Sequence, residues 1–295
     1  MSARAGGWWR RWERPLKDRL SEPLHLNLLS ALVRIAGGFR LQVEFDLVER
    51  RRYAFALLQA ADWAVRFGVP RICALEFGIA AGAGLVNLAR LAQRVTRETG
   101  VRIDIIGFDT GTGMPEPVDY QDYPEEFQRG DFPTTDRDAL ARLLPPGVRV
   151  IYGPIAETAR GFIDNIDAPV GFISFDLAFH SSTVDAMQVL RGPATRYLPI
   201  VSCYVGGIMM DTANPDVGEL LAIREFNASS AMRKLHPMTW LRERRVFKNA
   251  FWHRQIYTFH VHDHPLRSPT GHRARATRLL EDPTGASAPT GQVTP

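Results

Sequence analysis

The chain has 295 residues, of which 45% are hydrophobic and 23% are charged, with a formal net charge of +4. These are ordinary globular values, and the length allows a core large enough to need no disulfide staples. The basic excess lies at the two ends and the middle is close to neutral, so charge gives no reason to expect nucleic-acid binding. Cys73 and Cys203 lie in apolar runs typical of buried free thiols, which favours a reducing, cytoplasmic compartment.

The amino-terminal part of the chain has helical patterns. A helix is predicted over residues 24–36, and apolar residues at helical spacing predict a long helix over 44–67. The apolar run 24–35 is too short and too polar to be a signal peptide or a membrane span. We therefore expect a helical extension over residues 1–69 and no integral membrane segment.

Residues 1–22 contain three tryptophans among arginines. This composition allows a membrane-surface anchor. We favour a frayed or core-docked start instead, because chain termini are usually weakly ordered unless they are tied down. The tryptophans are Trp8, Trp9 and Trp12.

Strands and helices alternate over residues 70–264, which we predict to be one domain. Strands are predicted at 72–77, 103–108, 148–152, 170–175 and 198–204, with a late strand or hairpin within 251–262. Helices are predicted at 84–98, at 136–144, at about 183–191 with Ser181, Ser182 and Thr183 as capping candidates, and from the N-cap Asp216 to about 228. Alternation of this kind predicts an α/β fold with a doubly wound, mostly parallel sheet.

A long loop and a polar tail flank the predicted elements. The loop, residues 110–135, forms either a lid that closes over a ligand or an ordered surface loop, and its pattern does not decide between them. Its candidate lid residues are Tyr120, Tyr123, Phe127 and Phe132, with Asp119, Asp122 and Asp131 among them. Residues 265–295 are rich in Pro, Gly, Ser and Thr, and we expect them to be disordered.

A glycine-rich turn, Glu76-Phe77-Gly78-Ile79-Ala80-Ala81-Gly82-Ala83-Gly84, follows the first predicted strand. Glycines there permit positive φ angles and a close approach of a ligand to the main chain, and the next helix points its N-terminus at that ligand. The spacing G-x-x-x-G-x-G differs from the dinucleotide fingerprint, since Asn87 stands where the third glycine should be. No lysine is present to make a phosphate-binding P-loop.

Asp109 ends the second predicted strand, 25 residues after Gly84. A carboxylate at this position can accept hydrogen bonds from two ribose hydroxyls. The alternative is a tight turn with a surface aspartate. Because the glycine turn, the strand before it and Asp109 occur together, they favour a site for a nucleoside-containing cofactor.

Several segments of the chain resemble a known family. Residues 76–84 resemble motif I of the class I S-adenosylmethionine-dependent methyltransferases. Residues 107–115, GFDTGTGMP, are similar to the second-strand segment G-F-D-[TS]-x-x-G-[LM]-P of the macrocin O-methyltransferase group. Further likeness to that group lies in residues 153–158, 173–183 and 218–226, so the resemblance covers roughly residues 70–230.

The resemblance implies a Rossmann-like sheet of the class I methyltransferase type, with S-adenosylmethionine as cofactor. It also implies methyl transfer to a small-molecule acceptor, through a hydroxyl of that acceptor. The enzyme's main task is then to align this hydroxyl with the activated methyl group. The residues that would bind the cofactor are Glu76, Gly78, Ala80, Gly82, Gly84, Asp109, Thr110 and Gly153.

The chain departs from the family pattern where several members hold a divalent metal ion. Asp176 matches the first acid of the family's D-x-D-x-Y element, but Ala178 replaces the second acid and His180 replaces the tyrosine. No carboxylate occurs at Val205-Gly206-Gly207, where the family has an acidic pair, although Asp211 follows a few residues later. Hard cations need several oxygen ligands, so we expect no metal site.

Asp176 and His180 are the candidate catalytic residues. Asp176 ends a strand at the carboxyl edge of the sheet, where ligands bind in open α/β folds, although an aspartate there can simply cap a turn. His180 is a candidate general base, because histidine side chains in general suit proton transfer near neutral pH, or it is a loop-end histidine that caps the next helix.

Two further interpretations of the sequence remain. The chain could be a catalytically degenerate S-adenosylmethionine-binding protein that acts as a partner or regulator, or a Rossmann-like enzyme that uses a nicotinamide cofactor.

The histidine run near the end of the domain has two interpretations. On a strand, one face would carry His260, His262 and His264, which is a weak hint of metal binding. We favour the alternative that these residues form a solvated strand end. Among oligomeric states we consider a homodimer, which no residue pattern fixes.

Overall fold

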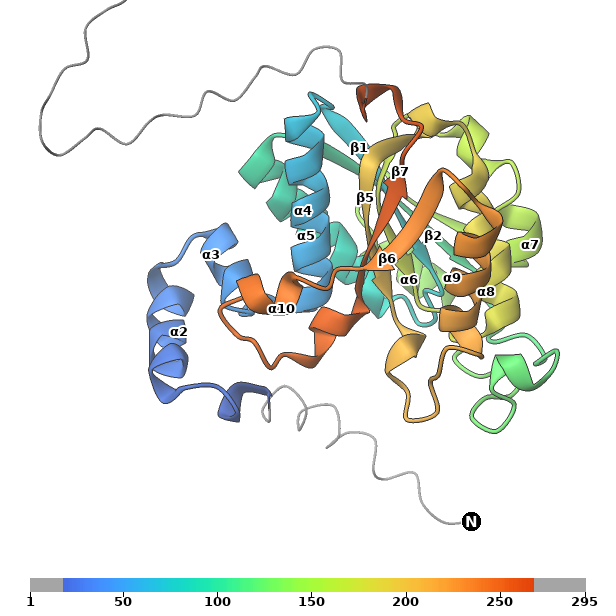
Figure 1. Ribbon diagram of the computed structural model, residues 1–295, viewed down its shortest axis with the longest axis horizontal. Helices are drawn as coiled ribbons and strands as arrows, with labels where there is room; N and C mark the ends of the chain where they lie inside the picture. The colour runs from blue at the N-terminus through green and yellow to red at the C-terminus, as the bar shows by residue number, and fades with distance from the viewer. Residues whose placement is uncertain (1–17, 268–295) are drawn as a thin grey trace, which may run out of the picture.

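The computed structural model describes residues 18–267, which form one seven-stranded sheet with helices on both faces (Figure 1). The strand order is β3-β2-β1-β4-β5-β7-β6. Strands β1 to β5 are parallel, whereas β7 runs antiparallel to both β5 and β6. The strands are β1 (Arg71–Phe77), β2 (Arg102–Asp109), β3 (Val148–Tyr152), β4 (Val170–Phe175), β5 (Tyr197–Val205), β6 (Arg233–Pro237) and β7 (Ile256–Val261). This arrangement confirms the predicted Rossmann-like, doubly wound and mostly parallel sheet.

Helices cover the two faces of the sheet because each buries an apolar stripe. Helices α4 and α5 pack side by side on one face, and α8 and α9 lie on the other (Figure 1). Every residue of β4 is buried, as expected for a central parallel strand. Cys73 on β1 and Cys203 on β5 are buried free thiols, as predicted. The helices of this part are α5 (Ala83–Thr99), α6 (Arg137–Leu143), α7 (Ile155–Thr158), α8 (His180–Ala186), α9 (Gly218–Ser229) and α10 (Leu241–Arg244).

The amino-terminal extension consists of α2 (Leu24–Ala36), α3 (Phe39–Glu44) and α4 (Arg51–Arg66). Helix α2 matches the prediction, and α4 forms most of the helix predicted over 44–67, but that helix begins at Arg51 and not at residue 44. The chain turns between Glu44 and Arg51, where Asp46 and Arg50 have φ angles of 53° and 48°. Helix α4 belongs to the same hydrophobic core as the sheet, so the predicted boundary after residue 69 falls inside that core.

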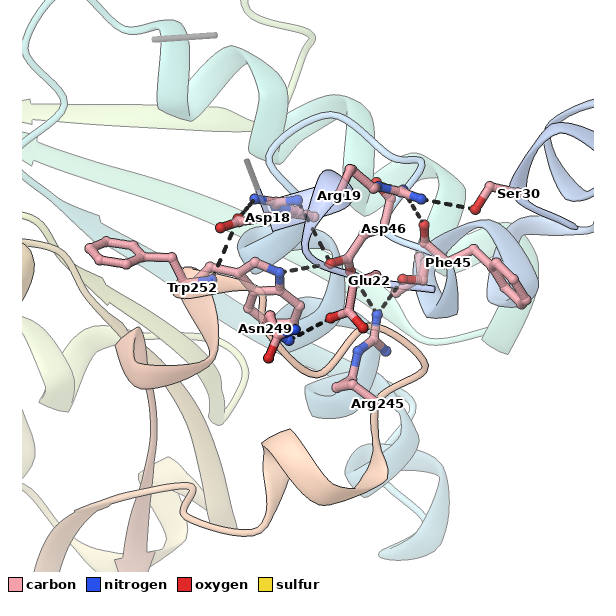
Figure 2. A network of polar contacts seen from close by, with 12 residues as sticks. Asp18, Arg19, Glu22, Ser30, Phe45, Asp46, Arg245, Asn249 and Trp252 are labelled. Atoms are coloured by element: carbon pink, nitrogen blue, oxygen red, sulfur yellow. Dashed lines mark hydrogen bonds and ion pairs between the residues drawn. The ribbon is translucent and has the colours of Figure 1, made fainter. Parts of the chain in front are cut away.

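A buried polar network holds this turn against the carboxy-terminal segment (Figure 2). The carboxylate of Asp46, whose side chain is 1% exposed, accepts hydrogen bonds from Arg245 Nη2 at 2.8 Å and Trp252 Nε1 at 2.9 Å. Arg245 also pairs with Glu44 at 2.7 Å and donates to the main-chain oxygen of Val43. The network therefore fixes the conformation of the residues that lead into α4.

Three predictions in the second half of the domain need correction. Helix α8 begins at His180 and not at Thr183. Two of the predicted capping hydroxyls have other partners, since Ser181 donates to Asp122 and Thr183 donates to the main-chain oxygen of Phe179. Asp216 does not cap α9, which begins at Gly218, because its carboxylate pairs with Arg224. Strand β6 was not predicted. It pairs with β7, which lies within the predicted late strand.

The predicted disordered tail begins with ordered residues. Pro265–Arg267 form a 3-10 helix, and Arg267 Nη2 donates to the main-chain oxygen of Pro199 at 2.7 Å. The rest of that tail and the three amino-terminal tryptophans lie outside the described residues. Within residues 18–267, no helix combines the length and the apolar character needed to cross a membrane.

Candidate functional site

A pocket of about 1030 Å³ opens at the carboxyl ends of the parallel strands. The loops that follow β1 to β5 all contribute to its wall, together with the long loop 110–135. This is the edge at which open α/β sheets bind ligands. From β1, β2 and β4 the lining includes Gly78, Ala80, Asp109, Thr110 and Asp176, and from the remaining loops it includes Met114, Phe127, Phe132, Pro154, Ile155, Gly206 and Gly207.

The glycine-rich turn after β1 has the conformation that its composition predicts. Gly78, Ala80 and Gly82 have φ angles of 83°, 47° and 83°, in the left-handed region that L side chains rarely adopt. A Cβ atom on Gly78 would collide with the main-chain oxygen of Asp176. The turn therefore brings the main chain of β1 directly against that of β4 at the pocket.

Glu76 lies behind the turn as a buried carboxylate, 2% exposed. Its Oε1 accepts a hydrogen bond from the Tyr53 hydroxyl at 3.0 Å and lies against Gly84, where no side chain would fit. Its Oε2 is buried and has no hydrogen-bond partner in the described part of the chain. Burial raises the pKa of Glu76 to about 8, while the Tyr53 hydroxyl and Arg50 oppose the rise. A cation bound next to Oε2 would restore the charged form.

Asp109 organises the turns after β1 and β2. Its Oδ2 accepts from the Ala80 amide at 2.9 Å and its Oδ1 from the Gly111 amide at 2.7 Å. An ionised carboxylate can accept further hydrogen bonds, so these contacts leave room for a ligand hydroxyl. The Thr110 hydroxyl is turned inward to the Gly113 oxygen, and Gly153 bonds to the Asp109 main chain just before the pocket-lining residue Pro154.

Asp176 lies on the pocket floor at the end of β4. The residue lines the pocket, and its surface is exposed there. Desolvation by the surrounding protein raises the pKa of Asp176, and Arg52 and Arg50 oppose this rise. Because the exposed surface limits this desolvation, the pKa rises most when a bound molecule covers the carboxylate.

His180 is not among the residues that line the pocket. Its Nε2 lies 2.8 Å from Glu225 Oε2, which joins the start of α8 to α9. Of the two candidate catalytic residues, Asp176 lines the pocket together with the glycine turn and Asp109. His180 lies outside the pocket wall.

Sequence reasoning missed the part that Glu219 plays in shaping the pocket. This residue, at the start of α9, is 1% exposed. Its Oε1 accepts from the amides of Leu177 (3.0 Å) and Ala178 (3.3 Å), and its Oε2 accepts from the Gly207 amide at 2.7 Å. One carboxylate therefore joins the loops after β4 and β5. Burial raises the pKa of Glu219 to about 8, and these three amides oppose the rise. The only sequence signal was the Gly-Glu pair that opens the helix.

The long loop over the pocket is tied down in its middle and near its carboxyl end. Asp122, 1% exposed, accepts from the amide and hydroxyl of Ser181, and the Thr134 hydroxyl donates to the Ala80 oxygen at 2.7 Å. Among the candidate lid residues, Phe127 and Phe132 line the pocket. Tyr123 is buried and packs at Gly218, and Tyr120 is 68% exposed.

The candidate metal ligands do not converge. Among residues 18–267, no three His, Cys, Asp or Glu side chains are grouped so that they could hold a metal ion. The rings of His260 and His262 stack 5.6 Å apart, but His264 is buried and its Nε2 lies 3.1 Å from the main-chain oxygen of Tyr197. Burial and the charge of Arg267 together lower the pKa of His260 to about 4.

Comparisons with known proteins place the fold. No family model and no curated protein matches the sequence. The O-methyltransferase NovP matches with a TM-score of 0.51 and 17% identity over 71% of this chain and 79% of that one. The calicheamicin methyltransferase CalS11 matches with a TM-score of 0.44 and 23% identity over 59% and 71%. TomG from Streptomyces achromogenes, an O-methyltransferase solved with its cofactor, gives 0.34 and 16% over 69% and 78%. The likeness to NovP shows that the chain has the class I methyltransferase fold expected from its sequence.

Proposed function

We propose that this protein transfers a methyl group from S-adenosylmethionine to a hydroxyl of a small-molecule acceptor. The observation that carries the proposal is the wall of the pocket, where the glycine turn of residues 78–84 faces Asp109. Spacing, backbone conformation and position at the strand ends all suit an adenosine cofactor that approaches the main chain closely.

The residues present fit this cofactor. Gly78 and Ala80 bring the main chain of the turn to the pocket, Asp109 can accept hydrogen bonds from ribose hydroxyls, and the unpaired Glu76 Oε2 suits the cofactor's ammonium group. Thr110 and Gly153 support this wall through main-chain contacts. When bound, the cofactor supplies a methyl group already activated by its sulfonium centre.

Asp176 is the residue that we assign to the acceptor. It lies on the pocket floor, and its raised pKa makes it a better proton acceptor near neutral pH than an ordinary aspartate. In this assignment Asp176 orients the acceptor hydroxyl and takes its proton as the methyl group is transferred. His180 is the weaker candidate, because its ring pairs with Glu225 and is not part of the pocket wall. No step requires a divalent metal.

Calorimetric titration with S-adenosylmethionine and S-adenosylhomocysteine, with and without magnesium, tests the cofactor. We expect both ligands to bind, magnesium to have no effect, and Asp109→Ala to bind at least about tenfold more weakly, as for loss of hydrogen bonds to a charged group. Glu116→Ala is the matched control, because Glu116 also lines the pocket but is exposed. If the wild-type protein bound neither ligand, the proposal would fail.

A methyl-transfer assay over a panel of hydroxyl acceptors separates the proposal from its alternative. Turnover that Asp176→Asn abolishes supports the assigned role. Cofactor binding without turnover of any acceptor would favour a catalytically degenerate protein that acts as a partner or regulator. Nucleic acid is not among the acceptors that we propose.

A homodimer remains our proposal for the oligomeric state. Leu24, Leu28, Leu32 and Ile35 form a stripe along α2, with 64–86% of each residue exposed. Such a contiguous apolar stripe suits contact with a second copy. Light scattering of the wild type and of Leu28→Glu tests this, since the proposal requires a dimer that the charged variant weakens.

A further inference from the structure

Three consecutive arginines, Arg50, Arg51 and Arg52, stand at the start of helix α4, and their side chains have different surroundings. Arg51 turns toward the buried polar network around Asp46, and its Nη2 lies 2.7 Å from Asp18 Oδ2. Arg52 lies over the Tyr204 ring, with 5.0 Å from its Cζ to the ring centroid, and Arg50 lies 5.7 Å from the Tyr53 ring. Within residues 18–267, the guanidinium groups of Arg50 and Arg52 form no hydrogen bond and no ion pair.

Two unpaired polar atoms flank Tyr53. The Nε of Arg52 is a buried donor with no acceptor in the described part of the chain, and Glu76 Oε2 is a buried acceptor with no donor. The Tyr53 hydroxyl donates to the other oxygen of Glu76 at 3.0 Å, and Arg52 Cζ lies 5.9 Å from the Tyr53 ring. Buried polar groups are normally paired because desolvation without a partner is costly. The unpaired Arg52 and the unpaired Glu76 Oε2 lie on either side of Tyr53, which indicates a ligand with an anionic group for the arginine and a cationic group for the glutamate.

The charges of the two arginines reach the pocket. Arg52 and Arg50 are the groups that oppose the rise in the pKa of Asp176 on the pocket floor, and both also act on Glu76. Asp176 follows β4, and Glu76 is the last residue but one of β1. Arg52 lies over the ring of Tyr204, two residues before the pocket-lining Gly206. The unpaired donors therefore lie behind the part of the pocket between these strand ends, next to its lining residues and not among them.

We propose that Arg52, supported by Arg50, binds the α-carboxylate of S-adenosylmethionine, while Glu76 faces the α-ammonium of the same amino-acid tail. A guanidinium group suits this role because its planar donors match a carboxylate in a bidentate geometry. The inference rests on the proposed function, since it concerns the cofactor of that site. It makes the amino-terminal extension a part of the binding site.

The buried network positions these arginines. Asp46 and Arg50, both with positive φ, stand at either side of the turn before α4, and Asp46 is held by Arg245 and Trp252 from the other end of the chain. Arg51 adds a second anchor through Asp18. Arg50 and Arg52 therefore point away from Asp18, toward the rings of Tyr53 and Tyr204.

Calorimetry with two ligands tests the proposal. S-adenosylhomocysteine carries the amino-acid tail, whereas 5′-methylthioadenosine keeps the adenosine and the sulfur but lacks that tail. We expect Arg52→Gln to weaken S-adenosylhomocysteine binding at least about tenfold and to leave methylthioadenosine within about twofold. Arg66→Gln on the same helix is the control, because Arg66 is exposed, lies over the Trp63 ring and is expected to affect neither ligand.

Arg52→Lys serves as a second variant that keeps the charge and loses the planar donors. It should weaken S-adenosylhomocysteine less than Arg52→Gln does, again without an effect on methylthioadenosine. Unchanged S-adenosylhomocysteine affinity in Arg52→Gln overturns the proposal, as does an equal loss for both ligands. Failure of the wild-type protein to bind either ligand instead overturns the proposed function itself, so the two failures are distinct.

Discussion

Replacing Asp46 by alanine should destabilise the fold far more than replacing an aspartate in a surface ion pair. The Asp46 side chain is 1% exposed, and its two oxygens accept from Arg245 and Trp252. Without this carboxylate the Arg245 guanidinium, 3% exposed, keeps Glu44 as its one charged partner among residues 18–267, and Glu44 is 40% exposed. Removal of one partner from a buried pair typically costs about 3–5 kcal/mol, because it leaves an uncompensated buried charge.

The matched control is Asp62→Ala. Asp62 also receives two hydrogen bonds from one arginine, Arg40, at 2.7 and 3.0 Å. Both of these side chains are nearly half exposed, and pairs of this kind contribute about 0–1 kcal/mol. The two variants thus compare similar hydrogen-bond geometry in different surroundings.

Urea unfolding followed by circular dichroism gives the free energy of unfolding of each variant. Asp46→Ala should lose several kcal/mol and also bind S-adenosylhomocysteine more weakly, because the turn that carries Arg50 and Arg52 is released. Equal losses of stability in Asp46→Ala and Asp62→Ala would refute the assignment of this network as the anchor of the extension.

Three other substitutions probe the site. The pKa of Glu76 is about 8 in the fold against 4.5 for an ordinary glutamate, so the folded state holds this proton more tightly and stability should fall as pH rises from about 4.5 to about 8. Urea unfolding of ligand-free Glu76→Gln should show a smaller fall than the wild type, and an identical pH dependence would contradict this. Gly78→Ala should lower the free energy of unfolding by at least about 1 kcal/mol more than Gly68→Ala does. Both glycines have positive φ, but only a Cβ atom at position 78 would collide with main-chain atoms. Equal melting temperatures of the two variants would contradict this prediction. Glu219→Gln should cost about 1–3 kcal/mol and speed hydrogen exchange at the three amides that it holds, whereas unchanged exchange would refute its role.

Sequence patterns were sufficient for the part of the fold that carries the pocket. The five parallel strands are short apolar runs, each separated from the next by a helical or loop segment. The central strands β1, β4 and β5 are buried almost throughout, as continuous apolar runs predict. The glycine turn and Asp109 were predictable because their function depends on backbone conformation and chain spacing. Both are local properties of the chain.

The missed features depend on residues that are far apart in the sequence. The helical spacing of apolar residues continues through Asp46, yet Asp46 takes a left-handed conformation because Arg245 and Trp252 capture its carboxylate. Strand β6 has a single buried residue, Leu235, and no apolar alternation, so only its pairing with β7 defines it. Glu219 is likewise an ordinary helix residue until three distant amides converge on it.

The departures from the family pattern at the ends of β4 and β5 are structurally linked. The Asp176 carboxylate points toward Gly206, and a Cβ atom at 206 would collide with Asp176 Oδ1. A side chain at that position, such as the family's acid, would force Asp176 to rotate away. Glycine at position 206 thus suits a site in which Asp176 is the one carboxylate. Glu219 joins the loops after β4 and β5 by accepting hydrogen bonds from their main-chain amides. Our proposal that Asp176 alone activates the acceptor requires no cation between these loops, so its decisive test is whether turnover is independent of magnesium and abolished by Asp176→Asn.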